Sequence, residues 1–293
     1  MRRPQMMTDI LTVDLEDWFH ICGVSRQLPR AQWLQLQSRV ETNTLKILDI
    51  MDQYQTRATF FVLGWVARHH GALVQEIDGR GHEIATHGYH HRRVYTQTPQ
   101  SFYVDVQRSL DALAPLVTAP IKGYRAPEWS IRDDSLWALE VLARSGLSYD
   151  ASMAPLPVIG NPAFPLVPHT RNTASGVLWE IPPLVGRMPK TALPLGGGWG
   201  LRVFPKRLIG YFIRRQHLRH APAVIFLHPR EFDAHCPKVP LPMAKRFVVS
   251  ARMECTEKRL HWLLTQYAFD TVSQYLTQKK VETKLGTHYF NSL

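Results

Sequence analysis

The chain has 293 residues and a mass of 33.7 kDa, long enough for one large α/β domain to bury its own core. Apolar residues make up 45% and charged residues 20% of the chain, a composition that excludes a disordered or low-complexity protein. The formal net charge of +11 predicts anionic partners, and the three cysteines are too widely spaced for a disulfide framework or a thiolate zinc site.

The N-terminal residues contain no apolar segment of the kind that signal peptides carry, and no run of 18 apolar residues occurs along the chain. We therefore expect a cytoplasmic protein with reduced thiols at Cys22, Cys236 and Cys255. We interpret the positive charge as spread along the chain. No nucleic-acid-binding motif accompanies this charge, so nucleic acid is not among the expected partners.

Apolar runs typical of strands alternate with stretches of helical period from residue 9 onward. Strands are predicted at residues 9–15, 57–63, 81–87, 121–125, 147–152, 176–182 and 223–228. Helices are predicted at residues 40–54, 65–79, 99–116, 133–146 and 205–218. Residues 153–176 contain Pro, Asn and Gly without periodicity and are expected to form a loop that shapes a site.

This alternation of strand and helix predicts an α/β fold with a parallel sheet. About seven units favour a single distorted (β/α) barrel over two domains, with an open doubly wound sheet as the alternative. In a parallel barrel the functional side chains gather where strands end, so the polar residues at these ends are the candidates for chemistry.

The first strand ends in three acids, Asp14, Glu16 and Asp17. Alternation along a strand places Asp14 and Glu16 on one face and Asp17 on the other, although a bend at the strand end would bring Asp17 round. Acids this close repel one another unless a cation or an arginine compensates them. The alternative is a cluster of acids at a helix N-terminus.

Histidines follow the third predicted strand, in the sequence THGYHH. His82 and His87 are five residues apart, which excludes the HExxH motif of zinc proteases. His87 and His91 are four apart, nearly on one helical face, a spacing that suits zinc or another first-row ion. A carboxylate from the first strand would complete a site of two histidines and one acid, whereas exposed surface histidines are the alternative; His90 receives no role.

Four motifs in this order, DLEDWF, THGYHH, YRAPEW and FLHPREFD, resemble the polysaccharide deacetylases of the NodB-homology type, carbohydrate esterase family 4. Within that family the chain is most similar to the group associated with bacterial exosortase (PEP-CTERM) exopolysaccharide clusters. The resemblance implies a distorted barrel of about seven strands over residues 8–235, the catalytic domain. Residues 236–293 would form a helical extension packed on the barrel.

By position, the resemblance implies that Asp14 is the general base, that Arg125 orients it and that His228 is the general acid. A protonated His228 requires a nearby carboxylate, and Glu231 or Asp233 would supply it. The reaction implied by the family is hydrolysis of an N-acetyl group on an amino sugar.

The metal ligands that the resemblance implies are His87, His91 and one carboxylate. The usual TFDDG of the family is replaced here by TVDLEDW, so the acidic ligand is Glu16 or Asp17. We favour Glu16 because alternation places it beside Asp14. The cofactor is one divalent metal ion, expected to be zinc, with cobalt, manganese or nickel as alternatives.

Substrate contacts are expected from aromatic and apolar residues near the strand ends. Trp18 and Trp129 have flat faces suited to stacking on sugar, and Leu227 would line a pocket for the acetyl group, although each is equally a candidate core residue. Glu128 stands where many family members have an aromatic residue. The basic segment 207–220 is either an ordinary amphipathic helix or a surface for anionic lipid or glycan.

We therefore expect a cytoplasmic, metal-dependent de-N-acetylase that acts on a polysaccharide or its lipid-linked precursor, with peripheral contact to the inner face of an anionic membrane. One alternative is a small-molecule amide or ureide hydrolase of the same barrel type. The other is a catalytically silent glycan-binding protein. The identity of the sugar and the oligomeric state stay open at this point.

Overall fold

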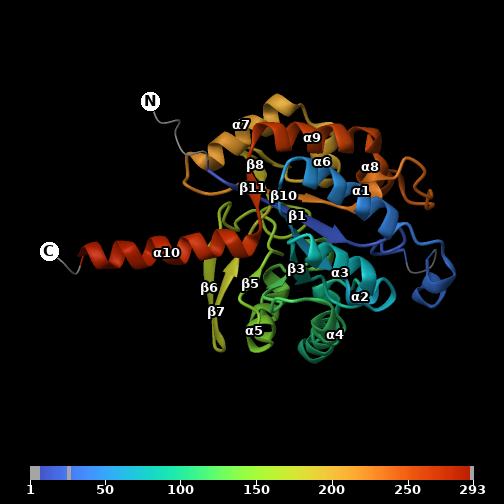
Figure 1. The fold of residues 1–293 in the computed structure, drawn as a ribbon, viewed down its shortest axis with the longest axis horizontal. Coiled ribbons are helices and arrows are strands. Elements are labelled where there is room, and N and C mark those ends of the chain that lie inside the picture. Colours follow the sequence, from blue (N-terminus) through green and yellow to red (C-terminus); the bar gives the residue numbers. More distant parts are fainter. Residues whose placement is uncertain (1–6, 25–27, 291–293) are drawn as a thin grey trace.

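A computed structural model describes residues 7–24 and 28–290, and a row of seven parallel strands forms most of its central sheet (Figure 1). The parallel strands are β1 (Asp9–Leu15), β2 (Thr59–Val62), β3 (Glu83–Thr86), β4 (Gly123–Tyr124), β5 (Tyr149–Asp150), β7 (Gly176–Glu180) and β10 (Val224–Leu227). They lie side by side in the order β10, β1, β2, β3, β4, β5, β7, and β6 (His169–Thr173) runs antiparallel at the edge beside β7. β1 and β2 are buried along their whole length, as expected of central parallel strands.

The sheet comes close to closing on itself through an irregular segment. The Leu184 N–H donates to the Val224 carbonyl at 3.0 Å, and the Phe226 N–H donates to the Gly196 carbonyl at 2.8 Å. The chain between β7 and α6 therefore lies along the free edge of β10, where a further barrel strand would lie. The fold is the distorted parallel barrel that the alternating pattern predicts, and the open doubly wound alternative is wrong.

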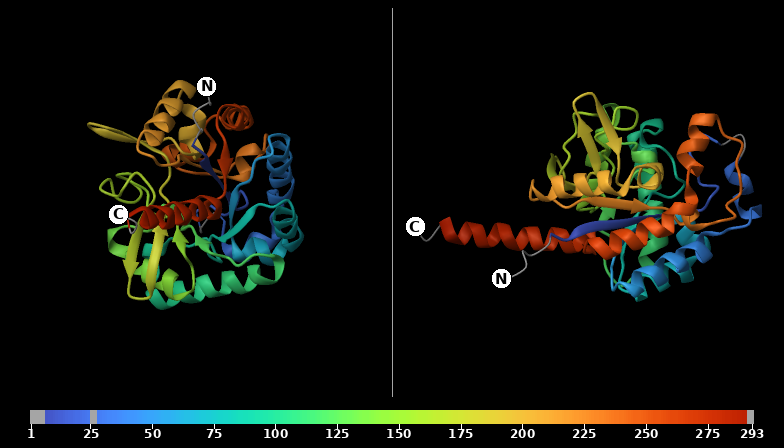
Figure 2. Two further views of the ribbon diagram at one scale, coloured as in Figure 1. Left: turned by 60° about the vertical axis from the view of Figure 1, so that its left-hand side comes forward. Right: turned by 90° about the horizontal axis from the view of Figure 1, so that it is seen from above.

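Helices on the outside of the sheet connect its strands (Figures 1 and 2). They are α1 (Val40–Gln53), α2 (Gly64–His69), α3 (Gly71–Gly79), α4 (Pro99–Leu113), α5 (Trp137–Arg144), α6 (Gly198–Val203) and α7 (Lys206–His217). α4 begins with Pro99 in its first turn and a capping box between Thr98 and Ser101, as the sequence predicts for a helix start. In α7 the apolar residues Ile209 and Ile213 are fully buried, so the basic segment is an amphipathic helix that packs on the barrel.

Three strands that the sequence analysis missed lie between β5 and α7. Residues 153–176 contain β6, which pairs with β7. The sequence of β6, HTRNT, does not alternate between apolar and polar residues, so it gives no sign of a strand. Beyond β7, β8 (Val185–Met188) and β9 (Thr191–Pro194) form a two-stranded hairpin. The predicted helix over 65–79 is two helices, because the chain leaves the helical conformation at His70. Short elements such as these are stabilised mainly by the segments that pack or pair with them, so the periodicity of their own sequence is a poor guide to them.

The C-terminal residues return to the sheet before they leave it. α8 (Met243–Ser250) and α9 (Thr256–Gln266) lead to β11 (Phe269–Asp270), which pairs in parallel with β1. α10 (Val272–Phe290) then extends away from the body of the molecule (Figures 1 and 2), although Val272 and Leu276 in its first turns are buried against Ile10 and Val224. Residues 1–6, which belong to the N-terminal segment considered in the sequence, and residues 291–293, the end of the predicted extension, lie outside the described residues. Among the described helices, none combines the length and the apolar character needed to cross a bilayer.

Candidate active site

A cavity of about 520 Å³ opens at the carboxyl ends of the parallel strands. Its polar floor carries Asp14, Glu16, His87, His91 and His228. Parallel strands all end at the same edge of a sheet, so β1, β3 and β10 deliver side chains that are distant in sequence to one place.

Glu16, His87 and His91 form a group whose ligand atoms all lie within 4.8 Å of one another. The Glu16 carboxylate is 2.8 Å from His91 Nε2. His87 Nδ1 is 2.8 Å from the Arg125 carbonyl, so Nδ1 carries the proton and Nε2 presents its lone pair. Two imidazoles and one carboxylate at this spacing fit a divalent cation of the zinc type.

The two histidines owe their approach to a turn and not to a helix. Residues 87–91 are irregular, so the expectation that His87 and His91 share a helical face is wrong. Gly88 has a φ of 73° and His91 a φ of 54°, both in the left-handed region that folds the chain back on itself. The turn is fixed by the Tyr89 N–H, which donates to Asp105 Oδ2 at 2.8 Å. His90, which received no role, lies 3.5 Å from the other oxygen of Asp105.

The electrostatics of the three groups suit a cation. Burial, reinforced by the charge of His91, lowers the pKa of His87 to about 4, so its imidazole is neutral near neutral pH. Burial also acts to lower the pKa of His91, but Cys22 and Glu16 outweigh it and the net shift is well upward. Burial acts to raise the pKa of Glu16, but the nearby charges of His91, His228 and Arg230 outweigh burial. The net shift of the Glu16 pKa is therefore downward. The site therefore holds the anionic carboxylate of Glu16 beside a protonated His91. A bound divalent ion would take the place of the proton on His91.

The Asp17 carboxylate lies apart from this group and serves the start of α1. Its oxygens accept hydrogen bonds from the Arg39 N–H at 3.0 Å and from the Ser38 hydroxyl at 2.5 Å. The Val40 and Trp18 N–H groups also donate to it. The structure therefore brings Glu16, and not Asp17, to His87 and His91; the N-terminal helix cap considered for the acid cluster applies to Asp17 alone.

Asp14 is held by the guanidinium of Arg125, which is completely buried. Arg125 Nη1 donates to Asp14 Oδ1 at 2.7 Å and to the Thr12 hydroxyl at 2.8 Å. Arg125 also stacks on Phe61 and Trp129, with its central carbon 4.1 and 4.5 Å from the ring centroids. The structure brings Asp14 and Arg125 together as the resemblance implies, and a buried pair of this kind keeps the carboxylate in one orientation.

His228 faces Asp14 across the cavity. Its Nε2 lies 3.8 Å from Asp14 Oδ2 and 3.9 Å from Glu16 Oε1, and its Nδ1 lies 3.3 Å from Glu231 Oε1. Burial acts to lower the pKa of His228, but Glu231 and the other carboxylates outweigh it and the net shift is upward. Of the two acids proposed to serve His228, Glu231 is the one beside it, whereas Asp233 pairs with Arg39 at 2.7 Å.

Only one of the three expected substrate contacts lines the cavity. Trp129 does so, with its ring against Phe226 at a centroid distance of 5.1 Å. Leu227 is fully buried in the core beneath β10, because alternation on that strand turns its neighbour Phe226 to the cavity instead. Trp18 lines a neighbouring cavity, and its indole N–H donates to the Gln37 carbonyl at 3.0 Å.

The structure adds residues that sequence reasoning did not place in the site. Cys22 Sγ lies 3.4 Å from His91 Nδ1, on the side of the ring opposite Glu16. Arg230 lies 3.9 Å from Glu16, and its Nε and Nη1 have no hydrogen-bond partner among the described residues. The sequence signals are weak, since Cys22 merely follows Glu16 on the same loop and Arg230 comes two residues after His228.

Charged residues at the mouth of the cavity are paired with one another. Glu128 accepts a hydrogen bond from Arg93 Nε at 2.6 Å and lies 3.7 Å from Lys245 Nζ. Lys245 also donates to the Cys22 carbonyl. Glu128 therefore fixes the side chains of Arg93 and Lys245 at the mouth.

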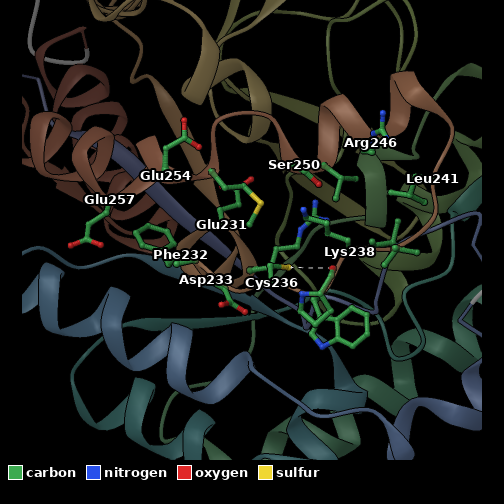
Figure 3. Close-up of a pocket in the computed structure, with 18 of the residues that line it drawn as sticks. Glu231, Phe232, Asp233, Cys236, Lys238, Leu241, Arg246, Ser250, Glu254 and Glu257 are labelled. Carbon is green, nitrogen blue, oxygen red and sulfur yellow. Dashed lines mark hydrogen bonds between the residues drawn. The ribbon is translucent and has the colours of Figure 1, made fainter.

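A second and larger cavity, of about 1190 Å³, adjoins the first (Figure 3). Figure 3 shows Glu231 and Asp233 on one side of it and Arg246 on α8 on the other. The two cavities share Ile21, Arg230, Glu231 and Val249 in their walls. The two cavities therefore adjoin at Arg230 and Glu231.

Two sequence families match the chain. Residues 31–147 match the family described as polysaccharide deacetylase, and residues 151–277 match a domain of unknown function, DUF3473. The site draws on both ranges and on the strand before them, since Asp14 and Glu16 precede residue 31 and His228 lies in the second range. Both ranges also contribute strands to the same sheet.

Similar proteins include two peptidoglycan-N-acetylglucosamine deacetylases of Bacillus cereus. One is 32% identical over 98 residues, covering 33% of this chain and 36% of the relative. The other is 28% identical over 92 residues, covering 31% of this chain and 43% of the relative. The chain thus spans less than half the length of the curated relatives it matches.

Solved structures show the same fold over nearly the whole chain. A Mycobacterium smegmatis protein assigned to the polysaccharide deacetylases has a TM-score of 0.59 at 18% identity, over 97% of this chain and 94% of that one. A peptidoglycan deacetylase of Bacillus subtilis has a TM-score of 0.50 at 15% identity, over 98% of both chains.

Proposed function

We propose that this chain, which belongs to the polysaccharide deacetylase family and carries a DUF3473 domain in its second half, is a metal-dependent hydrolase that removes N-acetyl groups from amino sugars. The observation that carries the proposal is the convergence of two separate groups on one cavity. Glu16, His87 and His91 can hold a cation, and Asp14 and His228 face each other beside them. Metal-dependent hydrolysis of an amide combines a bound cation with a proton acceptor and a proton donor.

Glu16, His87 and His91 would hold the metal ion, and zinc is the ion that their donor set favours. When bound, such an ion acts as a Lewis acid that polarises the amide carbonyl and lowers the pKa of water. The Arg125 carbonyl fixes the tautomer of His87, so that Nε2 is free to bind the ion.

Asp14 would act as the general base. Its Oδ1 is held by Arg125, which leaves Oδ2 directed toward His228 and the cavity. The buried guanidinium holds the carboxylate in one orientation, so that Oδ2 can accept a proton from the attacking water. Arg125 acts here through Asp14 and is a positioning residue.

His228 would act as the general acid. Glu231 and the other carboxylates outweigh burial and raise its pKa, which favours the protonated imidazole that can donate from Nε2 to the departing amine. Nε2 lies 3.8 Å from Asp14 Oδ2, so the proposed proton acceptor and proton donor border the same part of the cavity.

The substrate would be an acetylated glycan, and the Bacillus cereus relatives are named for N-acetylglucosamine in peptidoglycan. We propose a polysaccharide or its lipid-linked precursor as the polymer, with exopolysaccharide synthesis and a cytoplasmic location as the setting. The division into a catalytic domain over 8–235 and an extension over 236–293 stays a prediction.

The test is acetate release from N-acetylglucosamine oligomers by the purified chain loaded with zinc. Asp14→Asn keeps the shape of the side chain but removes the base, so kcat/KM should fall by about 10²–10⁴-fold. Asp49→Asn, which changes an exposed acid on α1 that pairs with Arg80 and lines neither cavity, is the matched control and should leave kcat/KM unchanged.

Three results would decide against the proposal. A fully active Asp14→Asn variant would remove Asp14 from the chemistry. Hydrolysis of ureides or small amides, without acetate release from any acetylated sugar, would favour the small-molecule alternative. Glycan binding that survives chelation, without hydrolysis, would favour a silent binding protein.

A further inference from the structure

The positive charge of the chain is concentrated in one part of it. Residues 151–253 hold 14 of the 35 lysines and arginines but only three of the 24 acids, so the whole formal excess of eleven charges lies there. This corrects the interpretation that the charge is spread along the chain. The three acids are withdrawn from the surface, because Glu180 and Glu231 are buried and Asp233 is paired with Arg39.

Exposed apolar side chains gather at the mouth of the active-site cavity, in the same part of the chain. Val158 and Val248 line this cavity and are nevertheless 90% and 44% exposed. Met243 and Phe247, on the same helix as Val248, are 78% and 49% exposed, and no residue of α8 is buried. Ile159 also lines the cavity and is exposed. We call these five residues the apolar rim.

The rim is continuous with the cavity and is flanked by basic residues. Trp199 lines the cavity and contacts Phe247, with ring centroids 5.7 Å apart. Arg246 is exposed on α8 itself. The β8–β9 hairpin, which projects from the body of the molecule (Figure 2), carries Lys190 at its turn and contributes Val185 to the cavity wall.

We propose that the apolar rim docks this face on an anionic lipid bilayer, so that the active site opens onto the membrane surface. Residues as exposed as Val158 and Met243 protrude, and a protruding apolar residue can enter the interfacial layer of a bilayer, where it leaves water. Within residues 151–253 the segments around the rim supply lysine and arginine while their acids are buried or paired, and Glu128 at the mouth is paired with Arg93 and Lys245, which matches a surface of anionic headgroups.

This docking goes beyond the proposed hydrolysis and needs no catalysis, so the two can fail separately. It also places the contact on α8 and the loop at residues 158–159, and not on the apolar face of α7. The α7 apolar residues Ile209 and Ile213 are buried in the core and are not available to lipid.

The experiment is sedimentation of the full chain with sucrose-loaded vesicles. One set contains phosphatidylcholine alone and the other contains phosphatidylglycerol at a third of the lipid. We expect partitioning to rise by more than about tenfold with the anionic lipid and to fall with added salt. The double variant Met243→Glu/Phe247→Glu should lose about tenfold or more of this binding, because it puts charge where apolar contact is proposed.

The matched control is Val104→Glu/Val177→Glu, which changes two similarly exposed apolar residues on α4 and β7. This control adds the same negative charge and should keep most of the binding. Equal losses in both double variants would show a general effect of net charge and overturn the proposal, as would binding that does not depend on anionic lipid.

A fluorescence measurement covers the case in which a variant folds poorly. Lipids brominated near the headgroup should quench Trp199 in the unmodified chain, because Trp199 lies beside Phe247 in the rim. The quenching should disappear in Trp199→Phe. Quenching that is the same in both chains would place the membrane contact elsewhere and overturn the proposal.

Discussion

At the scale of single residues, three neighbouring acids have three different surroundings. Asp14 pairs with Arg125, Glu16 lies beside His91, and Asp17 accepts backbone N–H groups at the start of α1. Alternation along β1 separates the first two from the third, and no bend brings Asp17 back. The chemistry of each carboxylate is therefore set by what surrounds it and not by its residue type.

This difference predicts opposite outcomes for two adjacent variants. Glu16→Ala removes a ligand and should abolish stoichiometric zinc binding, measured by elemental analysis after dialysis. Asp17→Ala should keep the zinc but lower the free energy of unfolding by about 1–3 kcal/mol, because several buried N–H and O–H donors lose their acceptor. Urea unfolding measures this loss.

Asp17→Asn is the control for the second variant, since its amide oxygen can still accept hydrogen bonds and the loss of stability should be smaller. Zinc loss in Asp17→Ala together with zinc retention in Glu16→Ala would reverse the assignment of the acidic ligand.

At the scale of elements, the short pairing of β5 with β7 carries a buried pair of acids. Asp150 on β5 and Glu180 on β7 are neighbours in register, and both are fully buried. Burial raises the pKa of Asp150 to about 6, and burial together with Asp150 raises that of Glu180 well above its ordinary value. In the folded protein the two carboxyl groups therefore hold protons that an unfolded chain would release.

The sign of the effect on stability follows from linkage. Above a pH of about 4, the ordinary range of these groups, the unfolded chain loses their protons while the folded protein keeps them. Their contribution to the free energy of unfolding therefore falls as pH rises through about 6, the pKa of Asp150.

Glu180→Gln should remove most of this contribution. The difference in unfolding free energy between Glu180→Gln and the unmodified chain should increase with pH between about 4 and 6, measured by urea unfolding at several pH values. Asp150→Asn should behave alike, and the double variant should add little because the two groups titrate together. A difference that does not change with pH would contradict this account.

At the scale of the whole molecule, the candidate site joins distant parts of the chain. The metal-binding group takes Glu16 from the end of β1 and two histidines from the turn after β3, while His228 comes from β10. Because the ligands come together only in the folded chain, an ion that binds them stabilises the folded state over the unfolded state.

Zinc should therefore raise the melting temperature of the metal-free protein. At a concentration of 100 times the dissociation constant, the gain of about 2.7 kcal/mol corresponds to a rise of roughly 4–5 °C for a chain of this size. Differential scanning fluorimetry measures the shift, and His87→Ala should show none. An unchanged melting temperature with every divalent ion tried would contradict the metal site.

Removal of the metal by a chelator should abolish acetate release while the far-ultraviolet circular dichroism stays native, because the apolar core includes none of the ligands.

The amino-acid sequence by itself determined the order of strands and helices from β1 to β5, the parallel sheet, and the residues at its carboxyl ends. Local periodicity and helix capping specify such elements, and parallel strands necessarily end together. Only the tertiary structure decided that Glu16 and not Asp17 meets the histidines, that Phe226 and not Leu227 faces the cavity, and that β6, β8 and β9 exist. Those outcomes depend on which segments of the folded chain come into contact with one another. Contacts between residues distant in sequence leave no periodic pattern in the sequence.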